Sequence, residues 1–514
     1  MPVKPYEMKF TMEEITGILR RLESCSLNKE DYEKIKVLIE TFIYMRLLLQ
    51  SKTTSLIKLL KRIFGFKTEK AKKILDKPKK LTPPSEKKPV KGHGRNGSAD
   101  YAGAKKETIP HESLKSGDAC PLCPKGKVYD LEPKRIIRME GAAPIQATIY
   151  ECQRLRCNLC GEVFTAMSPE GIGQDKYDET AGSMIAVLRY GSGLPFNRIE
   201  NLQKSMDMPL PASTQWEIVR DIAKKISPAY EELVKQAAQG EIIHNDDTTM
   251  RILDNVNPDT DRKGVFTTGI LSIKEGKKIA LFKTGSNHAG ENITELLRRR
   301  SPALPPPIQM CDGLSRNISK EFAALVANCM AHGRRNFVDL HSIFPEECRH
   351  AIEVIANVYK NDDDTKNMSP EERLAFHQAH SGPLMDDLRL WLIEKMDTKQ
   401  VEPNSSLGKA FSYMLRRWER LTLFLKVPNA PLDNNICEQA LKMAIRHRKN
   451  SLFYKTHNGA VVGDTFMSLI HTCNLCGANP FDYLNALQRH ASELAANPEL
   501  WMPWNYKDTI RTLA

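Results

Sequence analysis

The order of short apolar segments between residues 241 and 340 limits the fold of this chain more than any other feature. The segments VFTTGILSI and KIALFKT flank the turn residues KEGKK and predict a β-hairpin. EIIHNDDTTMRIL, just before them, predicts a strand that ends in acids. Helix, strand, helix, strand and helix then follow in NITELLRRR, PPPIQMCDG, SKEFAALV and ANCMAHGRRNFVDL. This order indicates an α/β sheet of the ribonuclease-H-like plan.

The 514 residues are too many for one ordinary domain, so we expect a multidomain protein built around this α/β core. Helical periodicity between the core and a further helix after Pro431 indicates a helical insertion. The expected order is an N-terminal helical region (1–75), a basic flexible linker (76–115), a zinc ribbon (116–168), a helical, helix-turn-helix-like DNA-binding region (169–236), the first part of the core (237–344), the insertion (345–430), the second part of the core (431–475) and a C-terminal helical tail (476–514).

Acidic residues fall at the ends of the expected core elements. Asp246 closes the first strand beside Asp247, Asp312 ends a later strand, and Glu438 opens the helix after Pro431. Side chains alternate along a strand, so only one of the two adjacent acids faces a given side, and the sequence does not decide which. Three converging carboxylates suit Mg²⁺, and two such ions about 4 Å apart promote phosphodiester transfer. We therefore expect two Mg²⁺ ions, with Mn²⁺ as an alternative.

Each of these residues also has a plainer interpretation. A strand-end aspartate such as Asp312, followed by glycine, is often a turn former. Asp433 or Asn434 can cap the first turn of the helix that carries Glu438, so Asp433 is better interpreted as a cap than as a ligand. His332 fits a proton carrier, a neighbour of the metal or a packed histidine at a strand end.

The basic residues favour a nucleic-acid partner. The net charge of +12 and the pI of about 9.0 indicate an anionic partner. Several bases lie near the predicted acids and would hold phosphates, although a solvated surface helix would explain those after Glu438 equally well. The expected phosphate-binding residues are Arg334, Arg335, Lys442, Arg448 and Lys449.

Two Cys-x-x-Cys pairs predict a structural zinc site. Cys120 and Cys123 are separated by 33 residues from the second pair, Cys157 and Cys160, and short strand-like segments lie between. Four thiolates can hold one Zn²⁺ in a closed tetrahedral site, as in a zinc ribbon. The remaining cysteines are expected to be structural: Cys152, which lies outside the spacing, Cys311 and Cys329 in buried strands, and Cys473 and Cys476 in a helix core.

Residues 178–227 predict a helix-turn-helix. A helix in LPFNRIENL is followed by a proline-containing turn and a second helix capped by Ser213. In the second helix Thr214, Gln215 and Arg220 would face a DNA groove, whereas Trp216 and Ile218 would pack. An ordinary helical connector is the equally weighted alternative.

The chain ends carry less information. Residues 7–75 predict a helical hairpin, with a self-association arm as the alternative, and WMPWNYKDT near the C-terminus suggests a tail. No run of eighteen apolar residues and no signal-peptide segment occurs, so we expect no membrane partner and a cytoplasmic, nucleoid-associated bacterial protein.

Several motifs together resemble the insertion-sequence-66 family of bacterial transposases, over roughly residues 90–490. KGHGR, the cysteine pairs and YGSGLPFNRIE…STQW resemble its N-terminal half. HNDDTTMRIL, QMCDG, CMAHGRRNF and LDNNICEQALKMAIRHRKNSLF resemble its catalytic segments, and the last two are long and specific. The resemblance assigns a catalytic triad to Asp246, Asp312 and Glu438. This chain departs from the family pattern by lacking Glu-Thr-Pro after the first acid, an aromatic residue soon after the second, and arginine after Glu438.

The resemblance implies a DNA transposase. Such an enzyme binds terminal inverted repeats, cleaves DNA at the element ends and joins the 3′-OH ends to target DNA. It also implies a homo-oligomer on paired ends and accessory proteins encoded by the same element. Two other hypotheses remain: a catalytically inactive zinc-ribbon DNA-binding regulator, and a structure-specific nuclease on the same fold.

Overall fold

The computed structural model separates the chain into two compact units, Met1–Asp76 with Ile145–Ala514, and Lys77–Pro144. All four expected zinc ligands, Cys120, Cys123, Cys157 and Cys160, and most of the basic linker lie outside the residues that the structure describes. Those residues are 12–64, 108, 113–119, 121–122, 126–131, 142–156, 163–167, 176–254 and 264–513.

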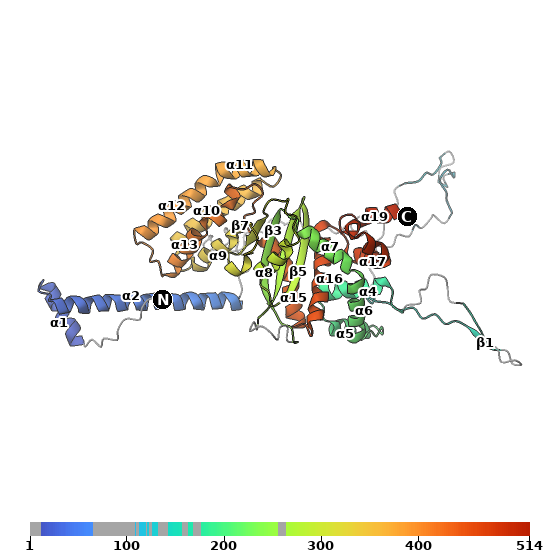
Figure 1. Ribbon diagram of the computed structural model, residues 1–514, viewed down its shortest axis with the longest axis horizontal. Helices are drawn as coiled ribbons and strands as arrows, with labels where there is room; N and C mark the ends of the chain where they lie inside the picture. The colour runs from blue at the N-terminus through green and yellow to red at the C-terminus, as the bar shows by residue number, and fades with distance from the viewer. Residues whose placement is uncertain are drawn as a thin grey trace. The chain divides into compact units, whose positions relative to one another are not determined.

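A mixed five-stranded sheet forms the centre of the larger unit (Figure 1). The predicted hairpin is confirmed, and its turn places Glu275 and Gly276 at φ values of 50° and 75°. The strand order is β5-β4-β3-β6-β7, with the first three antiparallel and the last two parallel to β3. The strands are β3 (Ile242–Met250), β4 (Val265–Lys274), β5 (Lys277–Gly285), β6 (Ile308–Cys311) and β7 (Leu325–Asn328). This arrangement is consistent with the expected α/β core.

The helix predicted in SKEFAALV is wrong. Residues 318–324 form bends and extended chain, and the segment ends in β7. Side chains from elsewhere in the fold hold this connection. The carbonyl of Asn317 accepts hydrogen bonds from Asn245 and Gln309, both at 2.8 Å, and the Ser319 hydroxyl lies 2.9 Å from that of Thr294. These contacts replace the local bonds of a helix.

Two helices cover opposite faces of β3 and β4. A Cβ on Gly269 would lie 2.8 Å from Leu441 of α15 (Asn435–Ser451), so α15 packs closely on that face. The neighbouring residue, Thr268, accepts a hydrogen bond of 2.7 Å from Asn292 of α8 (Ala289–Leu297). Because successive strand residues point to opposite faces, α8 and α15 enclose the sheet from both sides.

The outer edge of β5 is covered by α16 (His457–Cys476). The N–H groups of Ala280, Phe282 and Thr284 point outward and donate to side chains of the helix. Their acceptors, Thr472, Ser468 and Asp464, are spaced four residues apart and form one row along α16. The helix thus satisfies the edge groups that would otherwise pair with another chain.

Replacing Thr472 by valine tests how much these hydrogen bonds from β5 to α16 stabilise the fold. The hydroxyl of Thr472 accepts from the N–H of Ala280 at 3.1 Å and lies 3.2 Å from the Ala280 carbonyl. The isosteric change leaves a buried N–H without an acceptor, so we expect the free energy of unfolding to fall by about 1–3 kcal/mol. Denaturant unfolding measures the change. Thr512→Val, on the exposed face of α19 (Tyr506–Leu513), is the control and should change stability by less than about 0.5 kcal/mol.

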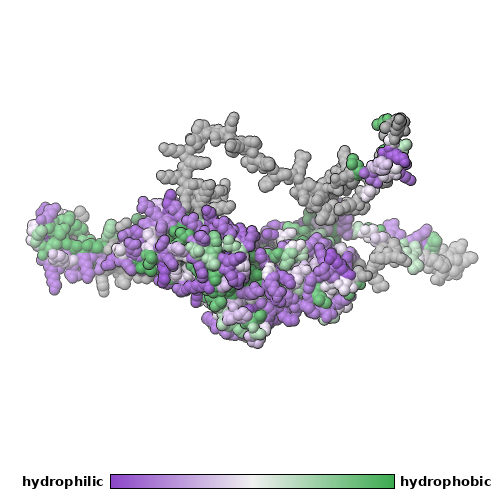
Figure 2. Space-filling model, turned by 90° about the horizontal axis from the view of Figure 1, so that it is seen from above, coloured by the Kyte–Doolittle hydropathy of each residue, from purple (hydrophilic) through white to green (hydrophobic). Residues whose placement is uncertain are grey.

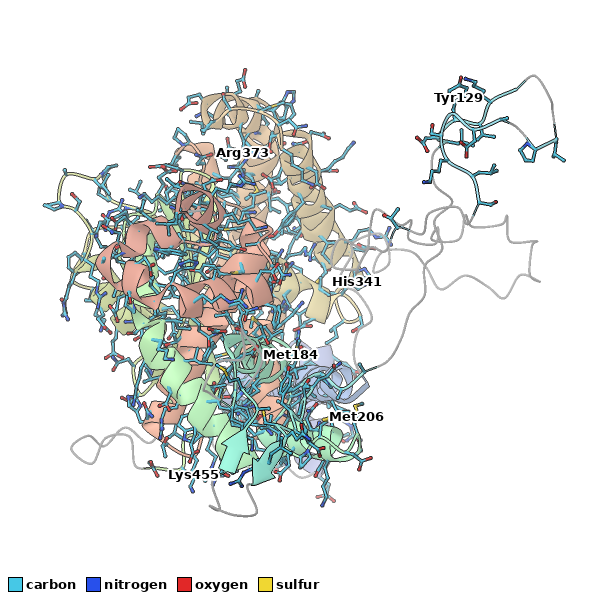
Figure 3. The ribbon with its side chains drawn as sticks, turned by 90° about the vertical axis from the view of Figure 1, so that its right-hand side faces the viewer. Tyr129, Met184, Met206, His341, Arg373 and Lys455 are labelled. Carbon is cyan, nitrogen blue, oxygen red and sulfur yellow. The ribbon has the colours of Figure 1, made fainter. Side chains whose placement is uncertain are left out.

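The expected helical insertion shares an apolar core with the helix before it and with residues of β3, β6 and β7. Arg373, labelled in Figure 3, ties it to the segment before α15, because its guanidinium donates to Asp362 at 2.6 Å and to the carbonyl of Ala430 at 3.2 Å. The helices are α9 (Met330–Leu340), α10 (Pro345–Asp364), α11 (Pro370–His380), α12 (Gly382–Asp397), α13 (Ser406–Arg416) and α14 (Trp418–Leu421), followed by the 3₁₀ turn η4 (Leu423–Leu425).

A second core joins the sheet to helices from both ends of the larger unit. Contrary to the prediction of a C-terminal tail, Trp501, Met502 and Tyr506 are buried in this core, because their large apolar surfaces pack against it. The helices before the sheet are α4 (Glu179–Ala186), the π-helix η2 (Val187–Gly191), α5 (Phe196–Lys204), α6 (Ala212–Lys225) and α7 (Ser227–Ala237). Those after it are α17 (Pro480–Arg489), α18 (Ala491–Ala496), the 3₁₀ turn η5 (Pro498–Trp501) and α19.

The N-terminal residues form two helices, α1 (Met12–Glu23) and α2 (Lys29–Phe64), as predicted. Arg21 and Asp31 join them through two hydrogen bonds of 2.7 and 2.8 Å. Phe42 and Leu49 are among the large apolar side chains that remain exposed on α2. The end of the molecule that carries α1 and α2 shows green, hydrophobic surface in Figure 2. Among the described residues, every helix is too short or too polar to cross a membrane.

Candidate active site

The register of two neighbouring strands places Asp246 and Asp312 at the same level. In the parallel pair β3 and β6, Ile242 lies opposite Ile308 and His244 opposite Met310. Two further residues along each chain lead to Asp246 and Asp312, which therefore face the same side of the sheet. The prediction that Asp246 ends its strand is wrong, because pairing with β4 carries β3 on to Met250.

Glu438 reaches the same side of the sheet from the first turn of α15. Burial, together with the negative charges of Asp312 and Glu438, raises the pKa of Asp246 to about 7. The three carboxylates therefore lie within range of each other's charge. The three expected acids thus meet on the α15 face, although 192 positions separate the first from the last.

Asp247 points to the opposite face and has other partners. Its carboxylate accepts from the hydroxyl of Thr268 at 2.6 Å and from the backbone N–H of Ala289 at 3.0 Å. His288 Nδ1 lies 3.3 Å from the same carboxylate. Asp247 therefore holds the start of α8 against the sheet, and Asp246 is the acid that lies with the other two.

The loop after Asp312 is held from two directions. Asp312 Oδ1 accepts from the N–H of Leu314 at 3.0 Å and from the amide of Asn317 at 2.9 Å. The hydroxyl of Tyr413 donates to the Asp312 carbonyl at 3.2 Å, and Arg417 donates to the carbonyl of Gly313 at 3.4 Å. The helical insertion thereby helps to position this acid. Sequence reasoning missed both insertion residues.

Asn434 joins the start of α15 to β3. This side chain is fully buried, and its amide nitrogen donates to the carbonyl of Asn245 at 3.0 Å. Its oxygen lies 3.1 Å from Nδ1 of His244, whose pKa burial lowers to about 4, so the neutral ring donates this bond. Of the two residues predicted to accept N–H groups of the first turn, Asn434 makes no such bond through its side chain. Asp433 instead accepts from the N–H of Asn435 at 3.0 Å.

The expected phosphate-binding bases have different surroundings. Lys442 and Lys449 are exposed on α15. Arg448 donates to the hydroxyls of Thr248 and Thr249 at 3.0 and 2.6 Å, and so it fastens the far end of β3 to α15. Arg334 and Arg335 are half-buried in α9, and Arg334 lies 5.6 Å from the centre of the Tyr359 ring.

The two helices expected to read DNA are α5 and α6. The prediction that Gln215 faces a DNA groove is wrong. Its side chain is fully buried, and its amide donates to the carbonyls of Phe196 and Leu210 at 3.2 and 2.9 Å. Thr214 and Arg220 are partly exposed. Trp216 and Ile218 pack against the core as predicted. The predicted Ser213 cap is wrong, because α6 already begins at Ala212, after Pro211.

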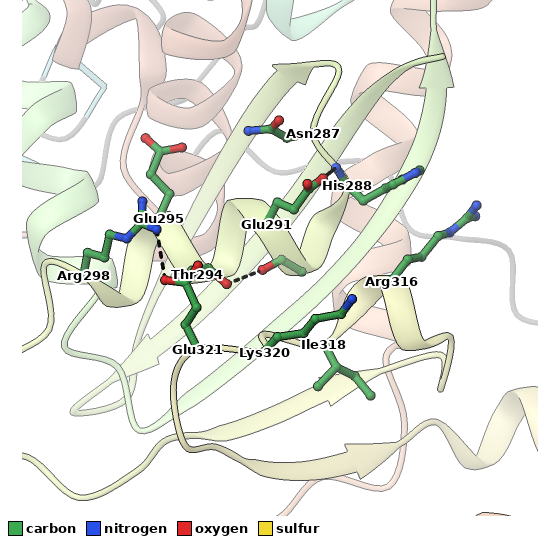
Figure 4. A pocket seen from close by; sticks show the side chains of 11 residues that line it. Asn287, His288, Glu291, Thr294, Glu295, Arg298, Arg316, Ile318, Lys320 and Glu321 are labelled. Carbon is green, nitrogen blue, oxygen red and sulfur yellow. Dashed lines mark hydrogen bonds and ion pairs between the residues drawn. The ribbon is translucent and has the colours of Figure 1, made fainter. Parts of the chain in front are cut away.

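A cavity of about 610 Å³ lies beside α8, on the face to which Asp247 points (Figure 4). Its wall carries both signs of charge. Arg298 and Glu321 form an ion pair of 2.9 Å there, and Arg316, Lys320 and Glu295 line the rest. Its lining residues do not include Asp246, Asp312 or Glu438, so the cavity is separate from the three acids.

The acidic cluster suits a divalent cation. Glu438 Oε1 is buried and has no hydrogen-bond partner among the described residues. Its oxygen donors and those of Asp246 and Asp312 are the hard ligands that Mg²⁺ prefers. A cation would also relieve the mutual repulsion that raises the pKa of Asp246.

Comparison with known proteins agrees with this geometry. Residues 176–462, more than half of the chain, match the family described as "Transposase IS66 family". The uncharacterized proteins y4hP and y4qI of Sinorhizobium fredii are 25% and 26% identical over 335 and 341 residues, which cover 62% and 63% of this chain. The chain spans 60% and 61% of these two relatives, and 36% of y4jD from the same organism, which is 31% identical over 186 residues. The chain belongs to the IS66 family of transposases.

Proposed function

We propose that this protein is a DNA transposase that cleaves DNA at the ends of an insertion sequence and joins the freed ends to target DNA. The observation that supports this function best is the meeting of Asp246, Asp312 and Glu438 on one face of the sheet. Neighbouring carboxylates with a raised pKa are typical of catalytic metal sites.

In this proposal both steps are phosphoryl transfers in one site. In cleavage, water forms a bond to the phosphorus, and the bond to the 3′ oxygen of the element end breaks, which leaves a 3′-OH. In joining, this 3′-OH attacks a target phosphodiester, and the displaced target 3′ oxygen leaves. Two Mg²⁺ ions, or Mn²⁺, held by the three acids would supply charge stabilisation for the attacking and leaving oxygens. Asp246, Asp312 and Glu438 would hold them in place.

The DNA would lie along basic side chains around the acids. Lys442 and Lys449 are exposed and are the best placed of the expected bases to meet phosphates, and Arg334, Arg335 and Arg448 would support them. Thr214 and Arg220 of α6 would contact the terminal inverted repeats. A zinc ribbon, with one Zn²⁺ held by the four paired cysteines, would add to this binding.

Lys442→Ala combined with Lys449→Ala tests the phosphate contacts. Each lost contact lowers the slope of log K against log salt by about 0.9, so the double variant should lower the slope by about 2. Fluorescence anisotropy with labelled duplex DNA between 50 and 200 mM salt measures it. Lys395→Ala with Lys409→Ala, which lie in the helical insertion, is the control. An unchanged slope in the first variant would remove these lysines from the interface.

The wider assembly also belongs to the proposal. Transposition joins two ends of one element, so a homo-oligomer on paired ends would act, with accessory proteins of the same element, in the bacterial cytoplasm on nucleoid DNA.

Incubation of the full chain with target DNA, Mg²⁺ and either intact or pre-cleaved element ends tests the function. Joined products would support the transposase. Cleavage of intact ends without joining would instead favour the structure-specific nuclease. End binding without cleavage or joining would favour the inactive regulator. Either of these two results would overturn the proposal.

A further inference from the structure

Three residues next to the acidic cluster form a group with different chemistry. Cys329 follows β7, His332 lies in the first turn of α9, and Glu438 lies in the first turn of α15. One possible ligand atom from each lies within 4.8 Å of the other two. The group therefore combines a thiol, an imidazole and one of the three acids.

The contact between His332 and Glu438 leaves room for an ion. Nε2 of His332 and Oε1 of Glu438 are 3.8 Å apart, too far for a hydrogen bond. The nitrogen and oxygen ligands of a tetrahedral zinc ion are separated by about 3.3–3.6 Å, given bond lengths of about 2.0–2.2 Å. His332 Nδ1 and Glu438 Oε1 are both buried without a hydrogen-bond partner among the described residues. A shift of a few tenths of an ångström would bring the His332 nitrogen and the Glu438 oxygen to the spacing of two ligands on one cation.

Burial raises the pKa of the Cys329 thiol to about 12, while two backbone N–H groups point at its sulfur. Its side chain is fully buried, and the backbone N–H of Asn434 donates to Sγ at 3.3 Å. The backbone N–H of His332 also points at the sulfur. Hydrogen bonds from N–H groups stabilise the charged form of an acceptor, and metal ligands are commonly oriented by such outer contacts.

We propose that Cys329, His332 and Glu438 form a binding site for a thiophilic divalent cation, with Zn²⁺ as the best fit. Sulfur, nitrogen and oxygen donors in one set suit Zn²⁺, whereas Mg²⁺ takes oxygen ligands and leaves a thiolate unused. With three protein ligands, the fourth position of the ion stays open. The site is distinct from the zinc ribbon expected at the four paired cysteines.

Glu438 belongs both to this site and to the three acids of the proposed reaction, so a cation bound here would affect that reaction. A Zn²⁺ ion bound to Cys329 and His332 withdraws the Glu438 carboxylate from the Mg²⁺ ions of the proposed reaction. Zn²⁺ therefore inhibits strand transfer in competition with Mg²⁺. This consequence rests on the proposed function, whereas metal binding does not.

Titration of the full chain with Co²⁺, a spectroscopic substitute for Zn²⁺, tests the site directly. The protein is first loaded with one equivalent of Zn²⁺ to fill the ribbon. Added Co²⁺ should then produce a thiolate-to-cobalt charge-transfer band that saturates at about one equivalent. Cys329→Ala should abolish the band, and Cys348→Ala, a second buried thiol in the helical insertion, should leave it unchanged. A band that survives Cys329→Ala would overturn the site, as would the absence of any band in the wild type.

His332→Gln provides a second variant if Cys329→Ala fails to fold, because His332 is partly exposed. This change should weaken Co²⁺ binding by at least about tenfold, the loss that even outer-contact changes cause in metal sites. Unchanged affinity would overturn the assignment of His332. The folded state of each variant is checked by circular dichroism.

The inhibitory consequence is tested by the rate of strand transfer with and without Zn²⁺, compared within each protein. The wild type should lose activity with added Zn²⁺ and recover it as Mg²⁺ is raised. His332→Gln should require at least about tenfold more Zn²⁺ for the same loss. A cobalt band without competition between Zn²⁺ and Mg²⁺ would overturn the sharing of Glu438. If the wild type joins no DNA, the proposed function fails, and the cobalt titration still decides the site.

Discussion

Asp246→Asn is expected to slow strand transfer by about a thousandfold and, in the same protein without metal, to stabilise the fold above neutral pH. The loss of activity follows from the loss of one carboxylate that would hold the metal ions. Metal ions contribute several kcal/mol to such transition states, and each 1.4 kcal/mol is tenfold in rate. The amide is nearly isosteric, so the fold should be retained.

The gain in stability follows from the pKa of Asp246. Burial, with the neighbouring charges of Asp312 and Glu438, raises this pKa to about 7, above the value of about 3.9 in an unfolded chain. The folded state therefore binds the proton more tightly, and the stability contributed by the protonated acid is lost as pH rises from about 4 through 7. At pH 8 the ionised acid costs about 2–4 kcal/mol, which asparagine avoids.

Thermal unfolding in EDTA at pH 5 and pH 8 separates these effects. The stability of Asp246→Asn relative to wild type should be greater at pH 8 than at pH 5, and added Mg²⁺ should stabilise only the wild type appreciably. Asp247→Asn is the matched control, because this residue lies next in the chain but points to α8. It should not show the thousandfold loss of strand transfer. Strand transfer within tenfold of wild type for Asp246→Asn would contradict the catalytic assignment.

Local sequence pattern predicted the parts of the fold that local contacts determine. The hairpin of β4 and β5 has a turn that needs positive φ at Glu275 and Gly276, and the KEGKK segment indicated it. The failed helix in SKEFAALV shows the limit. Its sequence has helical periodicity, but the carbonyl of Asn317 accepts bonds from Asn245, 72 positions away, and from Gln309 of β6, and these fix the preceding turn in another form.

The acids of the site were predictable because their type and position at element ends carry chemical information. The choice between Asp246 and Asp247 was not, since it depends on which face α8 and α15 cover. Tyr413 and Asn434 hold the acids through contacts across 101 and 189 positions of the chain. No local pattern marks such residues, because a polar side chain in a loop or helix looks the same whether its partner is water or a distant strand.

Asn434→Ala is expected to cause the largest loss of stability among the substitutions considered near the acids. The change leaves the carbonyl of Asn245 and the Nδ1–H of His244 buried without their partners. Each unsatisfied buried group costs about 1–3 kcal/mol, so the free energy of unfolding should fall by about 2–5 kcal/mol. Denaturant unfolding of the purified full chain measures it.

The same substitution should also slow strand transfer where the protein is still folded. Asn434 connects β3, which carries Asp246, to α15, which carries Glu438 four residues later. Without this hydrogen bond the first turn of α15 can move relative to β3. A displacement of about 1 Å can cost a hundredfold in rate. Asn435→Ala is the control, because this neighbour is exposed and its side chain contacts Asp433. Equal stability and equal joining rates in the two variants would show that Asn434 does not position Glu438.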